Sequence, residues 1–149
     1  KMSDFLPFKK MNERLEISKE DSDASYFNNL MYYGELMMKV ITLSLTSAVL
    51  DDKERHRYRL LHRLVRADGL GDWAMVIDDI LTGPSSQYLI NQVQEEQREL
   101  NQRFSGGTWQ YESVNFIIQA IKSLGIAIED VSPKTNGKLW FHNFALLRN

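Results

Sequence analysis

Residues 26–45 read YFNNLMYYGELMMKVITLSL, and this apolar stretch decides the fold class. Its apolar side chains recur at three- and four-residue steps, which is the spacing of one face of an α-helix. These positions are Tyr26, Leu30, Tyr33, Met37, Ile41 and Leu45. The short polar side chains of residues 21–23 can accept hydrogen bonds from the free N–H groups of a first helical turn. We therefore expect a long helix that begins there and reaches about Leu50.

Two charged residues, Glu35 and Lys39, lie inside this stretch. At the centre of a bilayer each would cost roughly 2.5–3.5 kcal/mol. The stretch is therefore predicted to be a core helix rather than a membrane span, and no membrane partner is expected. Residues 5–8 are too short for the apolar core of a signal peptide, so we expect a cytoplasmic protein.

The remaining helices are predicted from caps, breakers and apolar spacing. They cover residues 53–67, 72–81, 85–104, 108–124 and 139 to the end, with Asp51-Asp52 as a cap and Gly125 as a terminator. A brief extended segment is expected at 126–128, and residues 12–17 could form a turn or two of helix. The prediction is an all-α fold, a single bundle of about five to six helices. It occupies residues 21–149, is expected to continue beyond them, and follows an N-terminal extension at residues 1–20.

Composition narrows the function. With 149 residues, 43% of them hydrophobic, the chain is long enough for one domain with a sizeable core. It has no cysteine, which excludes disulfides and thiolate zinc sites. The three histidines, His56, His62 and His142, lack paired spacing on one helix face, so no metal and no cofactor are expected. A net charge of −2 means that any nucleic-acid site must come from local clustering of cations.

Such a cluster is present on the predicted helix 53–67. Arg55, Arg59, Arg63 and Arg66 fall within about 80° of one another at 100° per residue. Their guanidinium groups could hold successive phosphates of an RNA. The alternative is a solvated helix face balanced by nearby acids, and no aromatic side chain is counted among these arginines for base stacking. Leu60, Leu61, Leu64 and Val65 are expected to be buried on the opposite side.

Other catalytic patterns are weak. Arg57 and His62 are five positions apart, but on a regular helix they would point about 140° away from each other. The pair Asp78-Asp79 is interpreted as an exposed acidic edge.

Glu35 has two interpretations. A carboxylate in an apolar helix is costly to bury without a partner, and Arg148 is one candidate. The other is an edge position where Glu35 pairs with Lys39 one turn later.

The chain ends in Leu146-Leu147-Arg148-Asn149, an apolar helix that leads into Arg-Asn. With the long early helix and its Glu35, this resembles the HEPN domain (higher eukaryotes and prokaryotes nucleotide-binding). The architecture covers most of the chain, whereas the motif covers only its last residues. The resemblance implies a helical bundle that forms a homodimer, binds RNA or a nucleotide, and in active members is a metal-independent ribonuclease. Members often act in phage defence, toxin–antitoxin pairs or RNA processing.

By this resemblance, Arg148 would stabilise charge on the scissile phosphate and Glu35 would hold Arg148. Asn149 would orient the substrate or close the hydrogen-bond network. The family's motif is completed by a His about five positions after the Arg, and the printed sequence does not reach that position. We therefore expect a truncated motif and no catalysis by this chain. The alternative function is a non-catalytic helical module for protein interaction or regulation.

Overall fold

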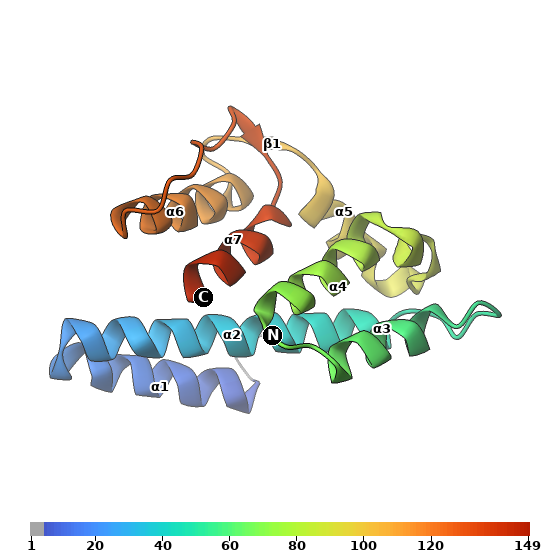
Figure 1. Ribbon diagram of the computed structural model, residues 1–149, viewed down its shortest axis with the longest axis horizontal. Helices are drawn as coiled ribbons and strands as arrows, with labels where there is room; N and C mark the ends of the chain where they lie inside the picture. Colours follow the sequence, from blue (N-terminus) through green and yellow to red (C-terminus); the bar gives the residue numbers. More distant parts are fainter. Residues whose placement is uncertain (1–4) are drawn as a thin grey trace. The chain divides into compact units, whose positions relative to one another are not determined.

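The computed structural model describes residues 5–149, and these form an all-α protein, as predicted (Figure 1). Seven α-helices lie in this range, with two short 3₁₀ helices and two strands of two residues each. In chain order the elements are α1 (Leu6–Asp21), α2 (Asp23–Ser47), α3 (His56–Val65), α4 (Leu70–Thr82), η2 (Pro84–Tyr88), η3 (Asn91–Val93), α5 (Gln94–Asn101), β1 (Phe104–Ser105), α6 (Trp109–Ser123), β2 (Lys134–Thr135) and α7 (Leu139–Arg148). None of the described helices is both long enough and apolar enough to cross a membrane.

The chain divides into two compact units within α2, at Ile41 and Thr42. The first unit contains α1 and most of α2, which run antiparallel. Phe8 of α1 meets Tyr33 of α2 edge to face, with ring centroids 5.8 Å apart. The expectation of only a turn or two at residues 12–17 was too short, because Pro7 starts α1 in its first turn and the helix continues to Asp21.

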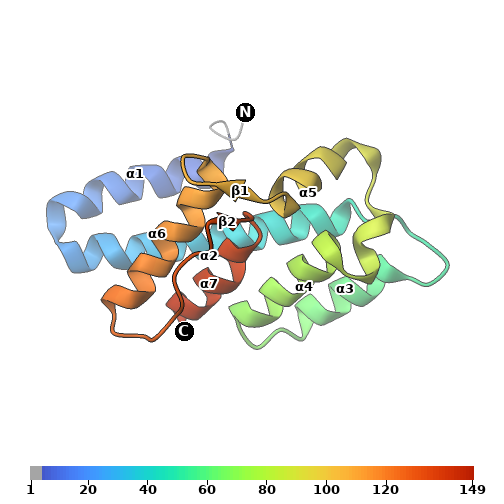
Figure 2. The ribbon, with the colours of Figure 1, turned by 90° about the horizontal axis from the view of Figure 1, so that it is seen from above.

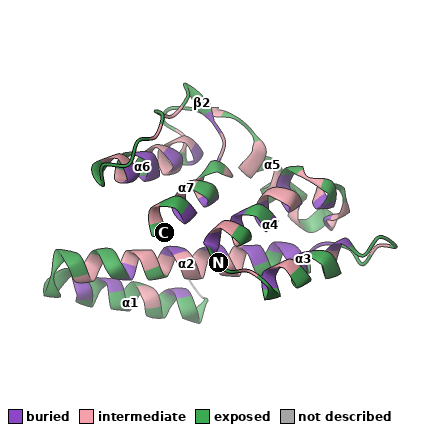
Figure 3. Ribbon diagram, in the orientation of Figure 1, coloured by how far each residue is buried: buried purple, intermediate pink, exposed green. Residues whose placement is uncertain are grey.

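The second unit contains the end of α2 and all elements from α3 onward. Helix α4 packs against α3 on one side and α7 on the other, and α7 also packs against α6 (Figure 2). Buried positions occur along α4, α6 and α7 (Figure 3). The largest of these core side chains include Ile77, Ile80, Ile121, Phe141 and Phe144. Burial of each such side chain stabilises the fold by about 1.5–3 kcal/mol.

Several predicted helix ends are confirmed by local hydrogen bonds. The Ser25 N–H donates to Ser22 Oγ at the start of α2, and the Tyr111 N–H donates to Thr108 Oγ1 at the start of α6. Gly125 has a φ of 78°, the left-handed conformation expected of a glycine after a helix. These caps act within a few residues, which is why the sequence pattern was sufficient to find them.

The predicted helix over 85–104 was wrong. The chain there forms η2, η3 and the short α5, because Leu89 is buried and pairs with Val49 across an antiparallel bridge. Two backbone hydrogen bonds flank this bridge, from Leu50 N–H to the Tyr88 carbonyl and from Ile90 N–H to the Ala48 carbonyl. The expected extended segment was also misplaced. Residues 126–128 form no strand, and the paired strands are β1 and β2.

Candidate nucleic-acid interface

Helix α3 has one buried face and one exposed face. Leu60 is 1% exposed and Leu64 is also buried, where α3 packs against α4 and η2. Leu61 and Val65 were expected to be buried beside them, but Val65 is 85% exposed and Leu61 is exposed too. The buried stripe is narrower than predicted because only residues spaced four apart face the neighbouring elements.

The exposed face of α3 carries a row of aromatic and cationic side chains. The Arg55 guanidinium carbon lies 4.6 Å from the centroid of the Tyr58 ring, and the Tyr58 and His62 rings are stacked at 6.3 Å with 27° between their planes. Tyr58 is 55% exposed. The expectation that no aromatic accompanies the arginines was therefore wrong. The i,i+4 spacing of Tyr58 and His62 was the signal that could have revealed the stack.

The arginine stripe is only partly assembled. Arg59 and Arg66 are exposed and form no ion pair within residues 5–149. Arg63 instead pairs with Asp79 of α4, with 2.8 Å between Nη1 and Oδ2. Asp79 also accepts a hydrogen bond from the Ser85 N–H, so this interaction joins α3, α4 and η2. Arg63 therefore has a structural role.

We call the remaining exposed set the α3 row. It consists of Arg55, Tyr58, Arg59, His62 and Arg66. At 100° per residue the last four lie within about 100° of one another, and Arg55 is the N-cap residue that precedes them. Cations alternate with flat rings along the row. This arrangement offers hydrogen-bond donors to phosphates and π faces to bases in the same strip.

The loop before α3 is held by Asp52. Its carboxylate accepts hydrogen bonds from the backbone N–H groups of Glu54 and His56, both at 3.0 Å, and lies 2.7 Å from His56 Nδ1. Partial burial raises the pKa of Asp52, but these hydrogen bonds lower it by more, so the pKa lies below its ordinary value. The His56 ring stacks on Tyr88 with centroids 4.3 Å apart.

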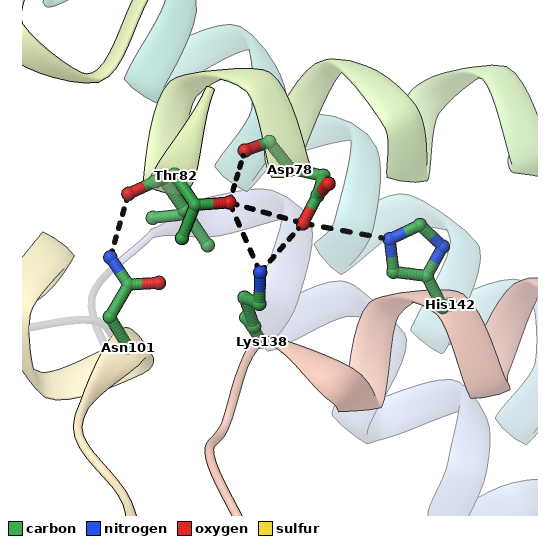
Figure 4. Close-up of polar contacts among 6 residues, drawn as sticks. Asp78, Thr82, Asn101, Lys138 and His142 are labelled. Carbon is green, nitrogen blue, oxygen red and sulfur yellow. Dashed lines mark hydrogen bonds and ion pairs between the residues drawn. The ribbon is translucent and has the colours of Figure 1, made fainter.

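A second polar cluster joins α4 to α7 (Figure 4). Lys138 Nζ donates to Asp78 Oδ1 at 2.9 Å and to Thr82 Oγ1 at 3.1 Å. His142 Nε2 lies 4.0 Å from the same Asp78 oxygen. The hydrogen bond from Lys138 lowers the pKa of Asp78, opposed by partial burial and aided by the charge of Lys138, the nearby His142 and the hydrogen bond with Thr82. Asp78 and Asp79 were predicted to form an exposed acidic edge. Instead, each forms an ion pair with another element, Asp78 with Lys138 and Asp79 with Arg63.

The residues assigned by resemblance lie in different units. Arg148 is in the last turn of α7, Asn149 follows it, and both are exposed. Glu35 lies on α2 in the first unit, where its Oε1 is 2.7 Å from Lys39 Nζ. This is the i,i+4 pair that was one of the two interpretations of Glu35. Its pairing with Arg148 stays a prediction.

Arg57 and His62, which are five positions apart in the sequence, interact with different residues. Arg57 is paired with Asp51 at 3.6 Å, whereas His62 stacks on Tyr58. Over residues 5–149, His, Asp and Glu side chains do not gather in groups of three or more that could hold a metal ion. No family model, curated protein or solved structure has a significant match to this chain.

Proposed function

We propose that this chain is an RNA-binding domain of the HEPN type, and that the α3 row is its RNA-binding surface. The observation that carries the proposal is the exposed stack of Tyr58 and His62 with the Arg55 guanidinium over the tyrosine ring. Stacking on an aromatic ring contributes about 1–3 kcal/mol per base in single-strand binding. Arg59, between the two rings, and Arg66, one turn after His62, supply phosphate contacts.

The preferred ligand is single-stranded RNA. A base can reach Tyr58 or His62 only if it is unstacked from its neighbours, and bases in a duplex are not. The row is also short: α3 has ten residues, about 15 Å of helix. The row can therefore contact only a short segment of the strand.

The test is fluorescence anisotropy with a labelled 12-nucleotide RNA, single-stranded and in duplex form, at several salt concentrations. The double variant Arg59→Ala/Arg66→Ala is expected to weaken single-strand binding and to reduce the slope of log K against log[salt] by about 1.4, since each phosphate contact contributes about 0.7. The matched control is Arg98→Ala/Arg103→Ala, which removes the same charge from exposed positions on α5 and after it. Equal losses in the two double variants would show that only net charge matters and would contradict the proposal.

Cleavage is a separate part of the proposal. Arg148 and Asn149 are the residues that would contact a scissile phosphate, as the resemblance implies. Incubation of labelled RNA with the parent chain and with Arg148→Ala distinguishes the two activities. We expect binding without cleavage, because the family's histidine is not among these residues. Cleavage that disappears in the variant would contradict this expectation and support a ribonuclease.

A second candidate function is a protein-interaction module. Leu61 and Val65 of α3 and Met75 of α4 are exposed apolar side chains of the same unit. Val65→Asn separates the two functions, because it leaves the charge of this surface unchanged, so RNA affinity should be retained while binding to a protein partner should fall.

A further inference from the structure

Arg55 has an unusual backbone conformation. Its φ and ψ are 58° and 42°, and among residues 5–149 it is the only non-glycine residue with a positive φ. This left-handed conformation costs an L residue free energy that glycine does not pay. Strained residues persist where the surroundings hold them, and they occur preferentially at functional sites.

The surroundings that hold Arg55 are Asp52 and His56. The Asp52 carboxylate accepts hydrogen bonds from the N–H groups of Glu54 and His56, which flank Arg55 on both sides. The Arg55 N–H donates to the Asp52 carbonyl at 3.0 Å. His56 closes the arrangement through its Nδ1 contact with Asp52, and its side chain is held in turn by the stack on Tyr88.

His56 is 7% exposed, so the imidazole is part of the protein interior rather than a surface contact. The buried ring holds Asp52 in a fixed position, because it cannot move without breaking both its stack on Tyr88 and its contact with Asp52. The direction of the Arg55 side chain follows from this backbone. The guanidinium is delivered over the face of Tyr58, where the cation and the ring attract each other.

We propose that Asp52 and His56 are positioning residues of the RNA-binding site, which act by holding Arg55 in its left-handed conformation over Tyr58. This inference rests on the proposed function. It explains why an arginine occupies a position where glycine would fold with less strain. Asp52 and His56 fix the position of the Arg55 guanidinium before RNA binds. RNA binding then carries no entropic cost for ordering this side chain.

The first experiment replaces Arg55 with glycine. Arg55→Gly is expected to raise the melting temperature, because glycine adopts the left-handed conformation without strain. The same variant is expected to weaken single-stranded RNA binding about fivefold to tenfold, because the cation is lost. If Arg55 had only a structural role, the more stable Arg55→Gly variant would bind RNA as tightly as the parent chain.

The second experiment is a double-mutant cycle between Asp52 and Arg55. Asp52→Asn should weaken RNA binding about threefold to fivefold when Arg55 is present and should have no further effect on the Arg55→Gly protein. The matched control is Asp72→Asn. Asp72 accepts hydrogen bonds from the N–H groups of Asp68 and Gly69 at the start of α4, so its loss should lower the melting temperature without changing RNA affinity.

The outcomes separate this inference from the proposed function. If Tyr58→Ala and Arg66→Ala weaken RNA binding but Arg55→Gly does not, the positioning role is wrong and the RNA-binding surface stands. If Asp52→Asn lowers affinity equally in both backgrounds, Asp52 acts on the fold rather than through Arg55, and the inference is overturned. If the parent chain binds no RNA, the proposed function itself fails.

Discussion

Lys138 and Asp78 are 60 residues apart in the sequence, and their side chains meet at 2.9 Å. The bond links the residue before α7 to the C-terminal half of α4, and a backbone bond from the Lys138 N–H to the Leu100 carbonyl adds the end of α5. One lysine therefore connects three helices. Within the second unit, these bonds add to the packing of α7 against α4 and α6.

Replacing Lys138 with methionine should reduce the free energy of unfolding by about 0.5–1.5 kcal/mol. Lys138 is only 20% exposed, and its loss leaves the half-exposed Asp78 without its main partner. Urea titration followed by circular dichroism measures the change. Lys122→Met is the control, because Lys122 pairs with Asp130, whose side chain is 79% exposed, and it should cost less than about 0.5 kcal/mol. Equal losses would mean that the Lys138 bond is no more than a surface ion pair.

Asp78 should make stability depend on pH in the acidic range. Its pKa is lower in the folded protein than the ordinary value of about 3.9, because Lys138 donates a hydrogen bond to it. The carboxylate therefore contributes stability above the unfolded pKa, and this contribution is lost as the pH falls through the folded pKa. Its size is at most about 1 kcal/mol, because the side chain is 45% exposed. Urea midpoints from pH 6 to pH 2 should fall less steeply for Asp78→Asn than for the parent chain. Parallel curves would refute this assignment.

Tyr58→Ala should weaken binding of single-stranded RNA by about fivefold to tenfold or more, because the base loses its stacking partner. Stability should change by less than about 0.5 kcal/mol, because the side chain is exposed and outside the core. Anisotropy titration and thermal denaturation give the two values. Tyr58→Phe keeps the ring and should retain the affinity, so a large loss in the phenylalanine variant would point to the hydroxyl instead of stacking.

Two adjacent leucines of α3 should respond very differently to truncation. Leu60→Ala is expected to cost about 2–5 kcal/mol because it leaves a cavity in the core, whereas Leu61→Ala should cost less than about 0.5 kcal/mol. Chemical denaturation of both variants measures the difference. Similar values would mean that α3 is rotated relative to the face described above.

Two glycines of the second unit form a similar pair. A Cβ on Gly83 would lie 2.8 Å from the Asp79 Cα, whereas a Cβ on Gly71 would meet nothing within 4 Å. Gly83→Ala should therefore destabilise the protein by about 1–3 kcal/mol. Gly71→Ala should stabilise it by about 0.5–1 kcal/mol, because alanine loses less backbone freedom on folding into a helix. Melting temperatures that move in opposite directions would agree with this assignment, and a fall in both would not.

The sequence alone determined the features that depend on residues within a few positions of one another. It predicted the all-α class, the long helix α2 with a cap within residues 21–23, and α6 between Thr108 and Gly125. Apolar spacing and caps act through hydrogen bonds and contacts of one helix, so these helices can be predicted from the order of the residues alone. The cluster of arginines on α3 was visible for the same reason.

Only the tertiary structure decided which of those arginines are available to a ligand, because Arg63 donates a hydrogen bond to Asp79, 16 positions away. It also decided that Leu89 pairs with Val49 and interrupts a helix that its own neighbours favour. The stack of His56 on Tyr88 and the bond between Lys138 and Asp78 belong to the same class. Each depends on a partner that packing brings close, and the free energy of that contact outweighs the local preference of the chain.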